Sequence, residues 1–278
     1  MKHPPPPLPK LSAHAELIDT HCHLDMEAYQ SDLDTVIQSA AQHGIKRIIT
    51  IGIDYPSSRR AVTIAEQHAN IFTAIGFHPH DALQATDGVL QDLAELAQSK
   101  SVVGYGEIGL DYAKNYAPRD VQIIAFSKQL HLAKELDLPV VIHDREAHED
   151  ILSLIRSMGH LPKGGVMHCF SGDYRLAQEM IDLGFYISIP GVATFTKAHL
   201  LHEVIRFTDL RHLLLETDGP FLAPVPYRGK RNEPSLLLYT AQMVADLKQI
   251  TLDEVAIATT ANALRLFHLP ETTSHDQR

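Results

Sequence analysis

The sequence LIDTHCHLD, residues 17–25, joins an apolar run to two histidines that are two positions apart. Side chains alternate between the faces of a β-strand, so His21 and His23 point the same way and Cys22 points the opposite way. Two imidazoles on one face at a strand end form half of a metal site. The stretch therefore predicts a first strand over residues 18–23 that delivers two metal ligands at its end.

Apolar runs of the same kind recur along the chain and alternate with segments of helical spacing. The predicted strands cover residues 18–23, 47–53, 71–77, 101–107, 139–143, 165–169, 185–189 and 212–217. The predicted helices cover residues 31–43, 57–69, 87–98, 119–136, 145–158, 174–183, 196–206, 235–247 and 252–267. Continuous apolar strands that alternate with helices are typical of a parallel sheet buried on both faces. Eight such units in about 250 residues predict an α/β fold, a closed (β/α)8 TIM-type barrel.

The competing architecture is an open, doubly wound sheet. Its dinucleotide-binding form would carry a glycine-rich phosphate motif after the first strand, and no such motif follows it here. No linker or shift in composition interrupts the repeating pattern. We therefore expect one barrel domain over residues 17–269, after a proline-rich flexible leader over residues 1–16 and before a flexible tail over residues 270–278.

Composition sets limits on the class of protein. The chain has 278 residues, of which 45% are hydrophobic, and no apolar run approaches the roughly 20 residues that cross a bilayer. We expect Cys22 and Cys169 to be small buried side chains, without a disulfide, in a cytoplasmic protein. The net charge of −10 gives no overall attraction for a polyanion, so binding nucleic acid would require metal ions and a local basic cluster.

Polar side chains gather where the predicted strands end, and that edge of a TIM barrel carries its chemistry. A single histidine at a strand end is ordinarily just a polar residue, and some of the 18 histidines fall there by chance. Chance does not readily place suitable ligands at the ends of five strands, with two on the first. The candidate metal ligands are His21, His23, Glu107, His143, His168 and Asp218.

Four imidazoles and two carboxylates exceed what one ion with an open position needs. They suit two divalent ions that share a bridging carboxylate. We expect Glu107 to be the bridge, because strand four lies between strand one and strands five and six. We expect Asp218 beside His21 and His23, because strand eight neighbours strand one once the barrel closes.

Basic residues follow two of the strands and could hold phosphate. Arg145 comes just after His143, and the segment YRGKRNE, residues 227–233, follows strand eight. A solvated charged turn explains that segment equally well on its own, but its place beside the metal ligands favours phosphate binding. The expected substrate contacts are Arg145, Arg228, Asn232 and His78, with His80 in a supporting position.

Together these motifs resemble the TatD family of metal-dependent deoxyribonucleases, within the amidohydrolase-like barrels. The matching segments are IDTHCHLD (18–25), GEIGLDY (106–112), PVVIH (139–143), HCFSG (168–172), ETD (216–218) and RGKRNEP (228–234), with Asn262 before Leu266 and Phe267. Two positions depart from the family pattern: Gly219, where the family often has Ser or Ala, and Asp144, where it often has Ser. The charge of Asp144 would weaken phosphate binding unless Asp144 pairs with Arg145.

The resemblance implies a TIM-type hydrolase with two metal ions on the six ligands already named, Mg²⁺ or Mn²⁺, with Zn²⁺ as an alternative. It implies a 3′→5′ exonuclease acting on DNA, favouring single-stranded ends. Asp218 would accept a proton from the attacking water, and Glu107 would bridge the ions. We expect a monomer without a membrane partner.

Two other functions stay open at this point. A hydrolase of small amides, lactones or phosphoesters could use the same dinuclear barrel, and the acidic net charge fits it better. A barrel that only binds a partner is the third possibility, although a binding protein has no need of six converging ligands.

Overall fold

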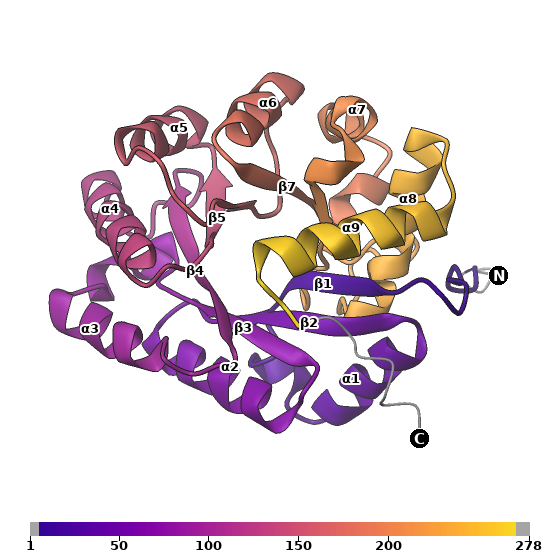
Figure 1. Cartoon of the computed structure of the whole chain (residues 1–278), viewed down its shortest axis with the longest axis horizontal. Helices are drawn as coiled ribbons and strands as arrows, with labels where there is room; N and C mark the ends of the chain where they lie inside the picture. Colours follow the sequence, from indigo (N-terminus) through magenta and orange to yellow (C-terminus); the bar gives the residue numbers. More distant parts are fainter. Residues whose placement is uncertain (1–5, 271–278) are drawn as a thin grey trace.

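Eight strands run parallel and pair in sequence order in the computed structural model, which describes residues 6–270 (Figure 1). Each strand pairs with the next one along the chain, as expected for a TIM-type barrel. The strands are β1 (Leu17–Cys22), β2 (Ile45–Ile51), β3 (Ile71–Ile75), β4 (Val102–Asp111), β5 (Val140–Arg145), β6 (Gly165–Met167), β7 (Phe185–Ile189) and β8 (Leu213–Leu215).

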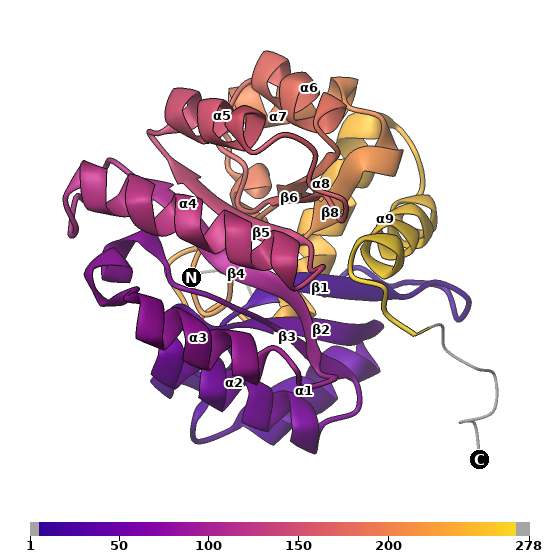
Figure 2. The same cartoon turned by 60° about the vertical axis from the view of Figure 1, so that its left-hand side comes forward.

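Helices surround the strands on the outside of the ring, as Figures 1 and 2 both show. They are α1 (Leu33–Gln42), α2 (Tyr55–Gln67), α3 (Asp87–Leu96), α4 (Arg119–Glu135), α5 (His148–Ser157), α6 (Tyr174–Asp182), α7 (His199–Phe207), α8 (Leu237–Lys248) and α9 (Leu252–Leu266). Local sequence determines where some of these helices begin: capping boxes at Asp54 and Thr251 form the N-termini of α2 and α9. Short 3₁₀ turns are η1 (Glu27–Tyr29), η2 (Pro79–Gln84), η3 (Gly191–Thr194), η4 (Leu210–His212) and η5 (Pro234–Leu236).

The ring closes between the end of β1 and the segment that follows β8. Cys22 forms a parallel bridge with Gly219. The amide of His23 donates to the carbonyl of Gly219 at 2.7 Å, and the amide of Asp218 donates to the carbonyl of His21 at 2.8 Å. These bonds confirm the closed barrel and bring two predicted ligand segments together.

Apolar side chains fill both sides of the strand ring. Residues of several strands, such as Ile18, Ile49 and Val141, form one cluster with Phe267, which follows α9. A larger cluster packs the outward-facing strand residues against the helices and includes Cys22. Burying a large apolar side chain contributes roughly 1.5–3 kcal/mol. This packing holds the strand ends, where the polar residues lie, in fixed positions.

Two strands extend further than their sequences predicted. β4 continues to Asp111 and pairs Gly109 with His143, and β5 continues through Arg145, so that α5 begins only at His148. Gly109 has φ +149°, and a Cβ there would collide with the carbonyl of His143. The glycine therefore allows β4 to stay against β5, although glycine in a strand ordinarily indicates its weakening or end.

The described part of the leader, residues 6–16, contacts the barrel. Residues 6–16 contain no helix or strand, but Leu8 and Leu11 pack against the core. Tyr239 donates from its hydroxyl to the carbonyl of Pro6 at 2.7 Å, and the amide of Ser12 donates to Asp253 at 3.1 Å. The rest of the leader (1–5) and the tail from residue 271 lie outside the described residues.

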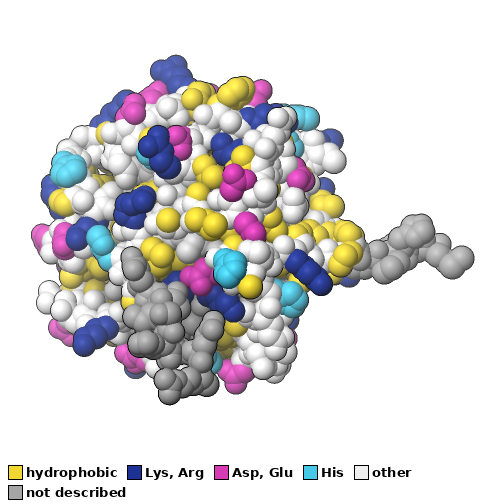
Figure 3. Space-filling model, turned by 45° about the vertical axis from the view of Figure 1, so that its right-hand side comes forward, with side chains coloured by type: hydrophobic (Ala, Val, Ile, Leu, Met, Phe, Trp, Pro, Cys, Tyr) yellow, Lys and Arg dark blue, Asp and Glu magenta, His cyan; other side chains and the backbone are white. Residues whose placement is uncertain are grey.

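The outer surface carries charges of both signs. On the face in Figure 3, lysine and arginine side chains are interspersed with aspartate, glutamate and hydrophobic side chains. Within residues 6–270, no helix combines the length and apolar character of a membrane span.

Candidate metal centre

His21 and His23 lie side by side at the end of β1, and both side chains are buried. Their Nε2 atoms are 3.3 Å apart. The Nδ1–H of His23 donates to the carbonyl of Ile51 at 3.2 Å, so Nε2 of the neutral ring presents its lone pair to the centre. The pair is arranged as two nitrogen ligands of one ion would be.

Asp218 joins these histidines across the seam where the barrel closes. Its Oδ1 is 3.4 Å from Nε2 of His23 and 3.7 Å from Nε2 of His21. Asp218 has φ +55°, a left-handed conformation that aspartate tolerates better than most residues. The structure thus places Asp218 where closure of the barrel was expected to bring it.

Glu107, on β4, is buried between two groups of histidines. Its Oε2 faces β1, at 3.4 Å from Nε2 of His21 and 3.9 Å from Nε2 of His23. Its Oε1 is 2.7 Å from Nδ1 of His143 and 3.5 Å from Nε2 of His168. The register between β4 and β5 shifts around Glu107, an irregularity that helps to aim a side chain. Each carboxylate oxygen therefore faces a different group of nitrogens.

The donor atoms fit a metal site. Imidazole nitrogens and carboxylate oxygens are the ligands that Zn²⁺ and Mn²⁺ take in proteins. The ligand atoms of His21, His23 and Glu107 all lie within 4.8 Å of one another, and so do those of Glu107, His143 and His78. The cluster thus has the composition and the convergence of a metal centre.

Burial and neighbouring charges set the protonation of this cluster. Burial opposes the charged rings, but hydrogen bonds to Asp111 and Glu107 raise the pKa of His143 to about 8. Burial likewise opposes charge on His168, but Glu216 and Glu107 raise its pKa to about 10. Burial works against ionised Glu107 too, yet the surrounding histidines hold the pKa of Glu107 well below its usual value. Metal ions would therefore bind in competition with protons.

Asp111 belongs to this cluster but was not among the predicted site residues. Its buried carboxylate oxygen Oδ2 accepts from Nε2 of His80 at 2.9 Å and lies 3.3 Å from Nε2 of His143. The signal was present in the sequence: in a strand, Glu107 and Asp111 share one face. It was missed because strand four was predicted to end at Glu107.

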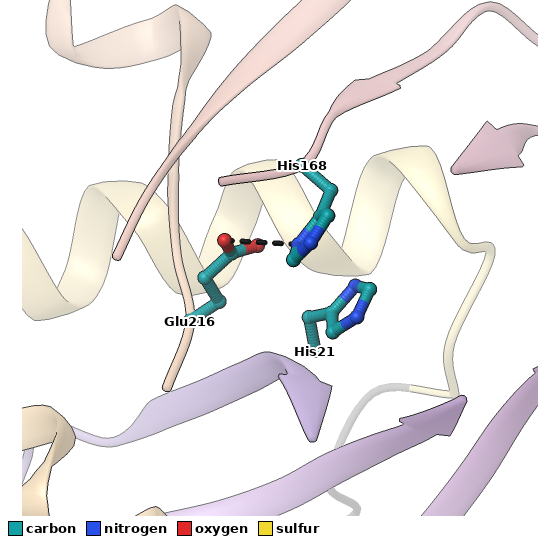
Figure 4. Close-up of side chains that lie close together, drawn as sticks. All are labelled: His21, His168 and Glu216. Atoms are coloured by element: carbon teal, nitrogen blue, oxygen red, sulfur yellow. Dashed lines mark ion pairs between the residues drawn. The ribbon is translucent and has the colours of Figure 1, made fainter. Parts of the chain in front are cut away.

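Glu216 was also omitted from the predicted site, although it was recognised at a strand end. Figure 4 shows its carboxylate directed at the ring of His168, with Oε1 at 3.0 Å from Nδ1. The same carboxylate accepts from the amide of Cys169 and from the hydroxyl of Ser188, each at 2.6 Å. Such a partner fixes the ring so that its other nitrogen, Nε2, points towards Glu107.

Asp19 ties the two closing segments to each other. Its buried carboxylate accepts from the amide of Thr217 at 2.9 Å, from the Thr217 hydroxyl at 2.5 Å and from the amide of His21 at 3.3 Å. Burial raises the pKa of Asp19 to about 7, despite the hydrogen bonds from Thr217. Asp19 thus supports the backbone that carries the first histidine and the last carboxylate.

Two predicted substrate contacts are exposed and free to meet a ligand at the mouth. Arg145 is the exposed last residue of β5. Arg228 is exposed and lies over the ring of Phe195, at 4.5 Å from its centroid. The charge of Asp144 is paired with Nδ1 of His148 at 2.7 Å, and not with Arg145 as considered above.

The other two predicted substrate contacts have different surroundings. His78 is buried, and its Nδ1 accepts from the amide of His80, so the neutral ring directs Nε2–H at Glu107 Oε1, 3.5 Å away. Asn232 is fully buried, and its amide nitrogen donates to the carbonyls of Thr217 and Phe221 at 2.7 and 2.8 Å. This position contradicts a phosphate contact for Asn232, which instead shapes the loop after β8.

Comparisons with known proteins show which family and which solved structures this chain is similar to. A family model described as TatD related DNase matches residues 18–268. YabD of Bacillus subtilis (strain 168), an uncharacterized metal-dependent hydrolase, is 44% identical over 253 residues, which cover 91% of this chain and 99% of YabD. The 3′-5′ ssDNA/RNA exonuclease TatD of Erwinia amylovora is 35% identical, and the match covers 91% of this chain and 100% of that protein.

A solved structure supports the same relationship. The TatD homologue YjjV of Escherichia coli K12 has a TM-score of 0.87 and 32% identity, over 91% of this chain and 98% of YjjV. The more distant organophosphorus hydrolase of Deinococcus radiodurans, at 14% identity and a TM-score of 0.58, shares the barrel fold.

Proposed function

Because the chain belongs to the TatD family of metal-dependent hydrolases, we propose that it removes nucleotides from the 3′ end of single-stranded nucleic acid by cleaving phosphodiester bonds. The observation that carries the proposal is the orientation of Glu107, whose two carboxylate oxygens face different groups of histidine nitrogens. A carboxylate with one oxygen towards each group of nitrogens could be shared by two divalent ions. A pair of ions supports in-line displacement at phosphorus.

Two sets of residues would hold the ions. His21, His23 and Asp218 would hold one ion with Oε2 of Glu107. His143 and His168 would hold the other with Oε1 of Glu107. Oxygen and nitrogen donors of this mixture suit Mn²⁺, Mg²⁺ or Zn²⁺. When bound, such ions supply an acidified water and neutralise charge on a phosphate oxygen.

Asp218 is the residue placed to manage the proton of the attacking water. Its carboxylate lies beside His21 and His23, and the residue is only 9% exposed. Burial disfavours its charge, but the hydrogen bond with His23 and the charge of His168 lower the pKa of Asp218. It is therefore ionised at neutral pH and can orient a water molecule and accept its proton.

Arg145 and Arg228 would receive the negative charge of the substrate. Both guanidinium groups are exposed at the mouth side of the barrel, after β5 and after β8. Arginine binds phosphate oxygens with paired N–H groups and remains charged at all working pH values. Arg231 is not available in the same way, because it forms a two-point ion pair with Asp32 at 2.7 and 2.9 Å. The local basic cluster is thus smaller than the YRGKRNE segment suggested.

The test is the degradation of a 5′-labelled single-stranded oligonucleotide in the presence of Mg²⁺ or Mn²⁺. We expect stepwise shortening from the 3′ end, its loss in EDTA, and a fall of at least about 100-fold in Glu107→Gln, since removing even an outer partner of a metal ligand costs 10- to 100-fold. Glu203→Gln, an exposed carboxylate on α7, is the matched control and should retain the activity.

Two results would contradict the proposed metal-dependent nuclease function. If no nucleic acid is shortened with Mg²⁺, Mn²⁺ or Zn²⁺ while a small phosphodiester or lactone is hydrolysed, the enzyme is a small-molecule hydrolase. Shortening that persists in EDTA would exclude the metal mechanism.

A further inference from the structure

Two aromatic rings stand exposed at the mouth, one beside each half of the metal centre. Tyr116 is 65% exposed and Phe221 is 49% exposed. Neither ring belongs to the hydrophobic clusters that pack the described part of the barrel. Exposed aromatic rings are ordinary on a protein surface, so what distinguishes these two is their place beside the histidines of the site.

Each ring contacts a histidine of the site. Tyr116 packs edge-on against His80, with ring centroids 4.6 Å apart, and His80 lies 6.3 Å from His143. Phe221 packs edge-on against His23, with ring centroids 6.0 Å apart. His143 and His23 face different oxygens of Glu107, so Tyr116 lies on the His143 side of this carboxylate and Phe221 on the His23 side.

The loop of Tyr116 is held rigidly although it follows a strand end. The amides of Ala113 and Lys114 donate to Oδ1 of Asp111 at 3.0 and 2.9 Å. The side chain of Asn115 donates to the carbonyl of Tyr112 at 3.1 Å. Tyr116 is therefore presented to solvent by a fixed loop, which reduces the entropy lost on binding.

The loop of Phe221 is fixed in a comparable way. The buried Asn232 amide donates to the Phe221 carbonyl at 2.8 Å, and the Phe221 amide donates to the carbonyl of Asp218 at 2.9 Å. The ring is thus positioned by the same backbone that positions the predicted proton acceptor. A displacement of Phe221 would disturb Asp218, so the two are held as one unit.

Flat, exposed rings on both sides of a phosphate-cleaving centre are what unpaired bases need. Every base has a π-face, so stacking on an aromatic side chain binds a single strand without selecting its sequence. Paired bases are already stacked and cannot separate onto two rings without unpairing. We propose that Tyr116 and Phe221 each stack on a base, one on either side of the phosphodiester bond that is cleaved; this inference rests on the proposed nuclease function.

The experiment combines variants that lack one aromatic ring with DNA strands that lack one base. A 5′-labelled oligothymidylate is compared with strands that carry one abasic nucleotide at successive positions from the 3′ end. For the wild-type enzyme, abasic nucleotides at two positions should each raise KM about 10-fold, the size of effect expected for one stacked base. In Tyr116→Leu one of these two penalties should disappear, and in Phe221→Leu the other.

The controls separate stacking from general damage. Tyr116→Phe keeps the ring and should keep the penalty. Phe207→Ala removes a ring that is equally exposed, at 65%, but packs on Tyr174, and it should leave KM unchanged. Both mouth rings are exposed, so their replacement does not open a cavity in the core.

The outcomes distinguish this inference from the function on which it rests. If the wild-type enzyme shortens neither the intact nor the abasic strands, the nuclease function fails and the stacking with it. If it shortens all strands with one KM, or if the ring variants keep both penalties, only the stacking is overturned.

Discussion

The backbone amide of Asp218 donates a 2.8 Å hydrogen bond to the carbonyl of His21, which joins the last predicted ligand to the first. The same closure places Oδ1 of Asp218 3.7 Å from Nε2 of His21. Barrel closure therefore brings these two ligands together. A variant that loosens the seam between β1 and the segment after β8 should weaken metal binding, even where no ligand is changed.

Glu216→Gln tests whether an outer carboxylate controls the metal centre. The amide oxygen of Gln can still accept from the amide of Cys169, and its NH2 group can donate to the hydroxyl of Ser188, but the side chain cannot pair as a charge with His168. We expect metal affinity to fall about 10- to 100-fold, the usual cost of losing such a partner. Isothermal titration with Mn²⁺ measures this, with Glu203→Gln as the control. Unchanged affinity would mean that His168 is oriented by other contacts or is not a ligand.

Asn232→Ala tests the structural role of a residue first expected at the substrate. Its buried amide satisfies the carbonyls of Thr217 and Phe221, and its removal leaves both unpaired. We expect a loss of about 1–3 kcal/mol in the free energy of unfolding, the cost of buried polar groups left without partners. Urea unfolding of the metal-free protein measures it. If Asn232→Ala were as stable as the wild type but had a raised KM for nucleic acid, the result would support a phosphate-binding role for Asn232.

His148 should have a raised pKa and therefore titrate at a higher pH than an isolated histidine. The hydrogen bond to Asp144, together with the charge of Asp144, outweighs partial burial and raises the pKa of His148. A raised pKa means that this pair stabilises the fold fully below the unfolded value of about 6.5, and that its contribution is lost as pH rises through the folded value. Asp144→Asn should lower the pKa of His148 in an NMR titration, whereas Glu149→Gln, at the exposed neighbouring position, should shift it less. If both substitutions shifted the pKa of His148 equally, the specific pairing of His148 with Asp144 would be contradicted.

Some parts of the site were open to prediction from sequence and others were not. The His21 and His23 pair follows from strand alternation, and the place of Asp218 follows from barrel closure, because both depend on regular geometry. Asp111 was missed because strand four was predicted to end at Glu107, and the close packing of Gly109 against His143 of β5 is visible only in three dimensions.

Loop residues were the least predictable. The composition of the segment after β8 suggests a phosphate-binding loop, but Asn232 turns inwards and Arg231 pairs with Asp32 on a distant segment. Neither partner can be read from local periodicity, since Arg231 pairs with a residue 199 positions away and the bonds of Asn232 lie within an irregular loop. The same reason explains why residues 6–16 pack on the barrel despite their proline-rich composition.

The central claim is that the two carboxylate oxygens of Glu107 bind two different metal ions. Anomalous diffraction from crystals soaked in Mn²⁺ tests this claim most directly. We predict two peaks roughly 3.5–4 Å apart, one on each side of Glu107. The first should lie among His21, His23 and Asp218, and the second between His143 and His168. A single peak, or two peaks that do not share Glu107, would contradict the account.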